Sequence, residues 1–84
     1  MGNKLSPEQE LLLAALEGGE NEGSLFLLQE DGAHWVRANG KDFKTDPARY
    51  VRAFRALFTE GYIDYQSGDQ YLVTDRGRAK AKDL

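Results

Sequence analysis

Apolar and polar residues alternate along the chain with two different periods, which predict helices and strands in turn. The first apolar segment, residues 11–16, consists of Leu and Ala and favours a helix. Ser6, Pro7 and Gln9 precede it, and together they are typical of a helix start with a capping box. Gly18 follows as a stop signal. We therefore predict a first helix that begins after Ser6 and directs its leucines into the core.

Two strands and a turn are predicted next. Residues 24–29 are apolar at their centre and predict a strand, and Asp31-Gly32 predicts a hairpin turn back through residues 33–36. Asn39-Gly40 repeats this turn signal. The conformation up to residue 46 stays open, because residues 41–44 fit either a short third strand or a simple loop.

The second helix has clear boundaries in the sequence. Asp46 is the predicted N-cap, Pro47 fits the first turn, and Gly61 ends the helix. Apolar residues repeat at helical spacing between them, and we expect all four to face the core: Val51, Phe54, Leu57 and Phe58.

The last third of the chain predicts a second hairpin and a final helix. Residues 62–66 and 70–74 form the strands, and their alternation places Ile63, Tyr65, Tyr71 and Val73 on a common side. Thr74 caps a last helix through about Lys82. Without internal repeats or linkers, residues 1–84 read as one α+β domain with the order α-β-β-α-β-β-α.

The apolar strand 24–29 leaves two arrangements of the sheet open. Helices on both sides would cover both of its faces, which suits a short chain that needs all of its core. Alternatively, helices cover one face, and either Phe26 and Leu28 or Leu25 and Leu27 remain for a protein partner, with Trp35 as anchor.

Composition excludes several kinds of chemistry. The 84 residues include no cysteine and one histidine, which rules out disulfides, thiol nucleophiles, iron–sulfur clusters and paired-histidine zinc motifs. His34 has no nucleophile or orienting group placed by spacing, so we expect a structural histidine whose ring is hydrogen-bonded. We predict no enzymatic activity, no cofactor, no metal and no small-molecule substrate.

Charge is unevenly distributed. Residues 1–36 carry one base and seven acids, a net charge of −6, whereas residues 37–55 carry six bases and two acids, a net charge of +4. The basic set consists mainly of Arg49, Arg52 and Arg55 on the second helix, with Lys41 and Lys44 beside them. Such a set is either a surface for nucleic acid or an exposed helix face with ordinary ion pairs, such as one to Glu60.

No apolar run is long enough to span a membrane, and none resembles a secretory signal, so we expect a cytoplasmic protein that does not act at a membrane. Met1, Gly2 and Ser6 match the N-myristoylation pattern, although Ser6 also has the capping role described above.

One segment resembles a known superfamily. It runs from Leu57-Phe58-Thr59-Glu60-Gly61-Tyr62-Ile63 through a tight hairpin to Tyr71-Leu72-Val73-Thr74-Asp75-Arg76-Gly77-Arg78. This stretch is similar to the end of the recognition helix, the wing and the following helix of bacterial winged-helix regulators. The resemblance implies a winged-helix-like fold, and the element order also resembles accessory domains of longer bacterial proteins.

The resemblance leads to two hypotheses. A DNA-binding winged helix has a helix directly before its recognition helix, whereas residues 24–44 predict strands here. The leading hypothesis is therefore a non-enzymatic module that binds a protein partner, or itself, through Phe26, Leu28 and Trp35. The alternative is a transcriptional regulator that binds nucleic acid through the basic second helix, although Asp64 and Asp69 make its hairpin tip acidic.

Overall fold

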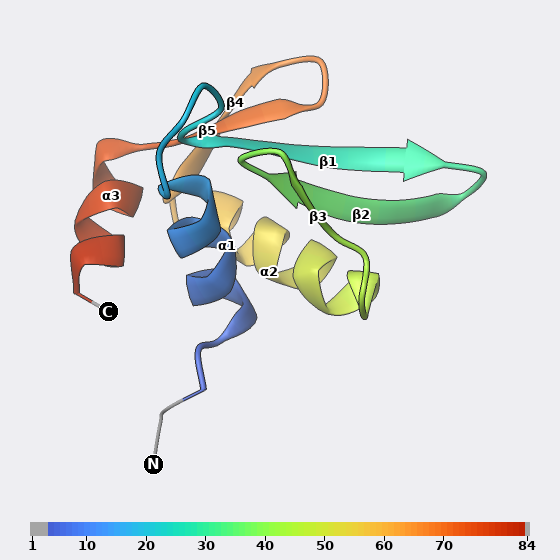
Figure 1. The fold of residues 1–84 in the computed structure, drawn as a ribbon, viewed down its shortest axis with the longest axis horizontal. Coiled ribbons are helices and arrows are strands. Elements are labelled where there is room, and N and C mark those ends of the chain that lie inside the picture. Colours follow the sequence, from blue (N-terminus) through green and yellow to red (C-terminus); the bar gives the residue numbers. More distant parts are fainter. Residues whose placement is uncertain (1–3, 84) are drawn as a thin grey trace.

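Three helices and one five-stranded antiparallel sheet make up the fold in a computed structural model that describes residues 4–83 (Figure 1). The α+β class predicted from the sequence is confirmed. The elements in chain order are α1 Pro7–Ala15, β1 Ser24–Glu30, β2 Ala33–Ala38, β3 Lys41–Phe43, α2 Pro47–Thr59, β4 Ile63–Ser67, β5 Gln70–Val73 and α3 Asp75–Lys82. Met1 and Gly2 of the myristoylation pattern lie outside the described residues.

The third strand corrects the predicted order, which becomes α-β-β-β-α-β-β-α. Asn39 and Gly40 both adopt positive φ, 52° and 81°, and this turn brings β3 back alongside β2. Val36 pairs with Phe43, and Ala38 pairs with Lys41. Of the two conformations left open for this segment, the structure has the strand.

β1 lies at the centre of the sheet, whose strand order is β3-β2-β1-β5-β4. On one side it pairs with β2 along its full length, from Leu25 opposite Ala38 to Glu30 opposite Ala33. On the other side, β5 pairs only with residues 24–26. The far end of the β1–β2 hairpin therefore projects beyond the neighbouring strands as a two-stranded ribbon (Figure 1).

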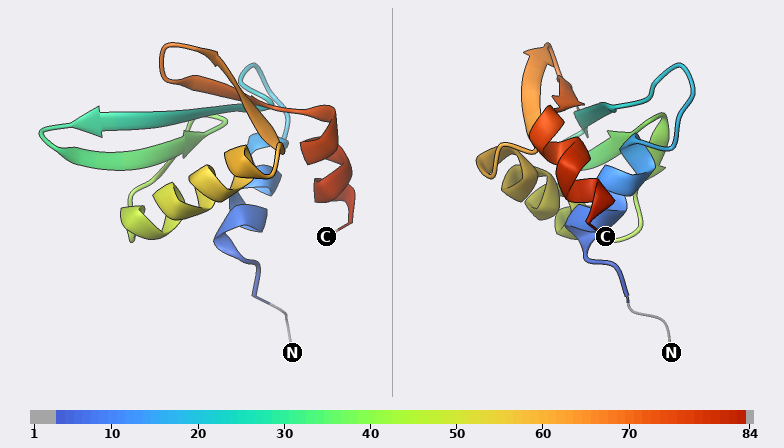
Figure 2. Two further views of the ribbon diagram at one scale, coloured as in Figure 1. Left: turned by 180° about the vertical axis from the view of Figure 1, so that it is seen from behind. Right: turned by 90° about the vertical axis from the view of Figure 1, so that its left-hand side faces the viewer.

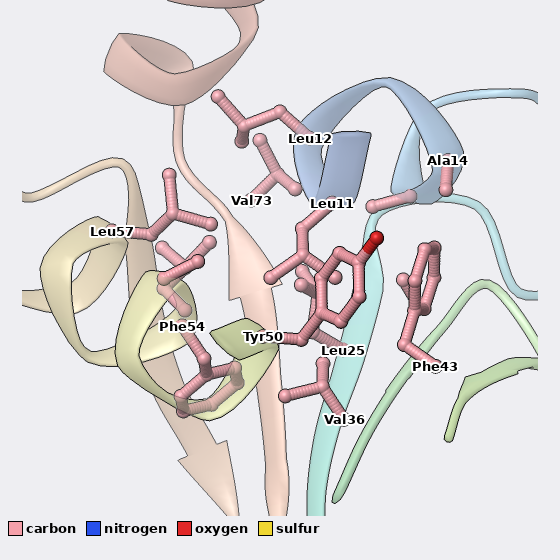
Figure 3. Packing of buried hydrophobic residues seen from close by; sticks show 14 of the residues in the cluster. Leu11, Leu12, Ala14, Leu25, Val36, Phe43, Tyr50, Phe54, Leu57 and Val73 are labelled. Carbon is pink, nitrogen blue, oxygen red and sulfur yellow. The ribbon is translucent and has the colours of Figure 1, made fainter. Parts of the chain in front are cut away.

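The three helices lie on one side of the sheet, so the fold has two layers (Figures 1 and 2). Side chains from the helices and from the inner face of the sheet form one hydrophobic core. Figure 3 shows Leu11 of α1 beside Leu25 of β1, and Leu12 of α1 beside Val73 of β5, with Phe54 and Leu57 of α2 to one side. Helix coverage on both faces of the sheet, one of the two arrangements considered, is not what the chain adopts.

The predicted N-terminal caps of α1 and α3 are both confirmed. The Gln9 amide donates to Ser6 Oγ at 3.2 Å, and the Ser6 amide donates to Gln9 Oε1 at 2.8 Å, which completes the capping box of α1. At α3, the Gly77 amide donates to Thr74 Oγ1 at 3.0 Å. Local sequence signals alone therefore placed these two helix starts correctly.

α2 departs from its prediction at both ends. Asp46 precedes the helix but has φ 57°, and its side chain makes no capping hydrogen bond. At the other end, Phe58 is 46% exposed rather than buried. Val51, Phe54 and Leu57 do face the core, together with Tyr50 and Ala53. The Phe58 ring meets Tyr71 of β5 edge to face, with ring centres 5.6 Å apart, at the margin of the core rather than inside it.

Tyr50 connects α2 to α1 and β3. Its hydroxyl donates to the Glu10 carboxylate, with oxygen–oxygen distances of 3.2 and 3.1 Å, and its ring centre lies 4.8 Å from that of Phe43. Burial raises the pKa of Tyr50, and the hydrogen bond to the negatively charged Glu10 raises it further. The hydroxyl thus remains a donor to Glu10 over the whole neutral range.

Asn39 joins the β2–β3 turn to the end of α1. Its Nδ2 donates to the carbonyl oxygen of Ala14 at 3.2 Å, in the last turn of α1, and to that of Gly18 at 2.9 Å, just beyond the helix. Its backbone amide also donates to Ser24 O at 2.9 Å. One residue therefore fixes the turn, the helix end and the start of β1 relative to one another.

Replacing Asn39 separates its two contributions. Asn39→Gly keeps the positive φ but loses the side-chain donors, so the free energy of unfolding should fall by about 1–3 kcal/mol. Asn39→Ala loses the donors and also strains the backbone, which should cost about 1 kcal/mol more. Urea denaturation followed by circular dichroism measures both, and a glycine variant as stable as the parent would contradict the role of the side chain.

Gly77 lies where α3 crosses the start of β4. A Cβ at this position would collide with the carbonyl oxygen of Tyr62 and lie 2.8 Å from Val73 Cγ1. Only glycine permits this approach of the helix to the sheet.

Gly77→Ala should therefore lower the free energy of unfolding by about 1–3 kcal/mol. The direction of this change distinguishes the collision from helix propensity, because alanine in a helix normally stabilises by about 1 kcal/mol relative to glycine. Thermal denaturation of the variant checks the prediction, and a rise in Tm would contradict the close approach.

Candidate interaction surfaces

The sheet face that points away from the helices carries a row of apolar side chains. Phe26 and Leu28 alternate on β1 with the inward-facing Leu25, and Trp35 on β2 lies directly opposite Leu28. Leu72 on β5, opposite Ser24, extends the row and is 37% exposed. We call these four residues the open face: Phe26, Leu28, Trp35 and Leu72.

The structure brings together the three residues predicted as a protein-interaction site, Phe26, Leu28 and Trp35. All three are partly exposed, and none belongs to the hydrophobic core. Leu72 was not predicted, although the alternation of Tyr71 and Val73 toward the core implies that Leu72 faces outward. None of the described helices covers this row (Figure 2).

Charged side chains border the open face at its β3 end. Arg37 donates from Nε to Asp42 Oδ1 at 2.6 Å and from Nη2 to Oδ2 at 3.3 Å, a two-pronged ion pair across β2 and β3. Lys44 Nζ lies 4.3 Å from the Trp35 ring centre. The indole nitrogen of Trp35 is buried and makes no hydrogen bond within the described residues.

The hydrogen bond from Arg37 holds the pKa of Asp42 below its ordinary value. The positive charge of Lys44 acts in the same direction, as does the nearby indole N–H of Trp35, which lies outside hydrogen-bonding geometry. Asp42 therefore stays ionised at the margin of the open face.

The five basic residues predicted as a nucleic-acid site line three different hollows: Lys41 and Lys44 share one, Arg49 lines a second, and Arg52 and Arg55 share a third. Lys41 lies over the Phe43 ring at 5.2 Å, and Lys44 lies over Trp35 on the open face. Arg49 lies near Lys4 and Glu10, 5.7 Å from the Tyr50 ring. The predicted stripe is divided because residues three apart on a helix rotate by about 60°, which separates Arg49 from Arg55 by about 120°.

Arg52 and Arg55 line a separate cleft of about 410 Å³ beneath the free end of the β1–β2 hairpin. His34 lines the same cleft from β2. It is exposed, and its ring makes no hydrogen bond within residues 4–83, so the expected hydrogen-bonded structural histidine is wrong.

An aromatic cluster on the helix side of the β4–β5 hairpin was missed by the sequence analysis. The Tyr71 ring centre lies 4.7 Å from Phe54, 5.6 Å from Phe58 and 5.4 Å from Tyr65. Tyr65 is 53% exposed and forms the outer edge of the cluster. The predicted common side of Tyr65 and Tyr71 is confirmed by their cross-strand pairing.

A groove of about 430 Å³ separates α1, α2 and α3. Leu12, Leu57 and Tyr62 form its apolar part, while Glu60 and Lys80 contribute charge at its lining. Its serine, Ser6, is engaged in the α1 cap. The lining holds no imidazole and no thiol.

Comparisons with protein-family models, with characterised proteins and with solved structures found no match to this chain. In the part of the chain that the structure describes, no three His, Cys, Asp or Glu side chains are grouped to hold a metal ion. None of the described helices is both long and apolar enough to cross a bilayer.

The pKa of Asp42 tests the arrangement at the margin of the open face. A carboxylate whose folded-state pKa is lowered stabilises the fold above its unfolded-state pKa and loses this effect as the pH falls through the folded-state value. Carboxyl-carbon NMR should find Asp42 titrating below about 3.9, the ordinary value for aspartate. Arg37→Gln should raise that pKa, and an unchanged value would contradict the ion pair.

Proposed function

We propose that this chain is a non-enzymatic, winged-helix-like interaction module, and that it binds another protein through the open face. The observation that carries the proposal is the apolar row of Phe26, Leu28, Trp35 and Leu72, which spans three adjacent strands and which no helix within residues 4–83 covers. Tryptophan and phenylalanine are enriched at protein interfaces, and tryptophan is among the residue types that contribute most of the binding energy.

The strand pairing supports the winged-helix-like part of the proposal. α2 leads into the β4–β5 hairpin, β5 returns beside β1, and α3 follows directly. These elements correspond to the recognition helix, the wing and the final helix of the resemblance. β2 and β3 stand where a DNA-binding member has a further helix, so the chain fits an accessory domain of a larger bacterial protein.

The charges at the margin favour a partner with an acidic group next to its apolar surface. Asp42 is already held by Arg37, whereas Lys44 makes no ion pair among residues 4–83 and lies over Trp35. A carboxylate of the partner could meet Lys44 while apolar side chains cover Trp35 and Leu28. Burying this row would remove apolar surface from water, which stabilises a complex by about 25 cal/mol for each Å² buried.

The alternative, binding of nucleic acid, is favoured only by the local charge of α2. Arg52 and Arg55 make no ion pair in the described chain, and the expected pairing of an arginine with Glu60 does not form there. However, the β1–β2 hairpin overhangs this side of α2, which obstructs its entry into a DNA groove. Asp64 and Asp69 at the second hairpin would also repel phosphate.

Trp35 is the only tryptophan of the chain, so its fluorescence reports on the open face.

The test of the proposal begins with a capture experiment, in which proteins captured from a lysate of the native cells are compared between the parent, Phe26→Ser and Phe58→Ser. Phe58 is an exposed aromatic residue on the other side of the sheet and serves as the matched control. A partner of the open face is lost with Phe26→Ser and retained with Phe58→Ser.

The captured protein is then purified and titrated against the chain. We expect a blue shift of the Trp35 emission and at least about a tenfold rise in Kd for Phe26→Ser, with a Phe58→Ser value within about twofold of the parent. Equal losses for both variants would contradict the proposal. Salt-dependent binding of duplex DNA that is lost in Arg52→Gln/Arg55→Gln would favour the alternative.

A further inference from the structure

The cleft under the β1–β2 hairpin forms a second surface, on the helix side of the sheet. It arises because β3 pairs only with residues 36–38 and β5 only with residues 24–26, so the hairpin end extends alone over the first half of α2. The side chains of Ala33 on β2 and Ala48 on α2 are small and leave the space between the hairpin and the helix unfilled. The volume of about 410 Å³ is within the range of ligand sites.

The lining combines positive charge with apolar surface. Arg52 and Arg55 lie one helical turn apart, and His34 approaches from the opposite wall. Neither arginine is engaged in an ion pair in the part of the chain described by the structure, and no carboxylate lines the cleft. Ala33, Pro47, Ala48 and Val51 supply the apolar part.

This combination selects among anionic ligands. Two guanidinium groups on one helix face suit a carboxylate, because each presents paired N–H donors that match its two oxygens. The apolar part suits an aliphatic side chain next to that carboxylate. A nucleic acid fits less well, because the imidazole of His34 is the only ring among the residues that line the cleft, and successive bases need several rings to stack on.

We infer that this cleft binds an acidic peptide segment of another protein, with a Glu or Asp between Arg52 and Arg55 and an adjacent aliphatic side chain against Val51. The cleft lies on the helix side of the hairpin and the open face on the other side, and the two adjoin at the hairpin edge, where Trp35 and Lys44 line a hollow next to His34. The inference rests on Arg52 and Arg55, which are not part of the open face, and not on the function proposed above.

A fluorescein-labelled peptide in which two Glu residues flank one Leu is the probe. Fluorescence anisotropy at low salt should give saturable binding, and the matching Gln-Leu-Gln peptide should bind at least about tenfold more weakly. Arg52→Gln/Arg55→Gln should weaken binding of the acidic peptide by a similar factor, and Ala48→Phe should weaken it by filling the cleft.

Arg49→Gln is the matched control, because it removes one positive charge from the same helix but outside the cleft. This variant should change the Kd of the acidic peptide by less than about twofold. Phe26→Ser should leave peptide binding unchanged, which separates this test from that of the open face.

Three results would overturn the inference. The first is the absence of saturable binding, and the second is an equal loss for Arg49→Gln, which would indicate diffuse charge. The third is a different occupant: tighter binding of a labelled single-stranded oligonucleotide, or self-association in sedimentation that Arg52→Gln/Arg55→Gln abolishes.

Discussion

The rest of the fold depends on β1, which pairs with the strand pair β2–β3 along one edge and with the strand pair β5–β4 along the other. Leu25, fully buried, lies between Ala38 and Tyr71 at the point where both pairings meet. Among the described strands β1 alone joins the two strand pairs, and side chains from both pairs enter the one core that the helices cover.

Local signals in the sequence predicted the features that short segments determine by themselves. The capping box at Ser6, the cap at Thr74 and the turn at Asn39 depend on residues within a few positions of each other. Phe58 was predicted wrongly because its burial depends on distant elements. Asp46 occupies the predicted N-cap position, but its side chain makes no capping hydrogen bond. The period of α2 marks an apolar arc, but it does not say where the sheet beneath the helix ends.

The candidate surfaces were predictable to the same extent. Alternation along β1 places Phe26 and Leu28 on one face, but only the packing of α1 and α2 decides that this face is the uncovered one. The cleft had no signal in the sequence, since it results from unequal strand lengths. The basic residues were correctly read as a cluster in sequence, whereas the fold distributes them over separate surfaces.

The projecting end of the β1–β2 hairpin separates these surfaces by the thickness of one ribbon. Trp35 faces one side of it, and its neighbour His34 faces the other. The ribbon also rests on α2 through the core side chains of β2, so the spacing between strand and helix determines the width of the cleft. A single pair of strands thus supplies a wall to one surface and the floor of the other.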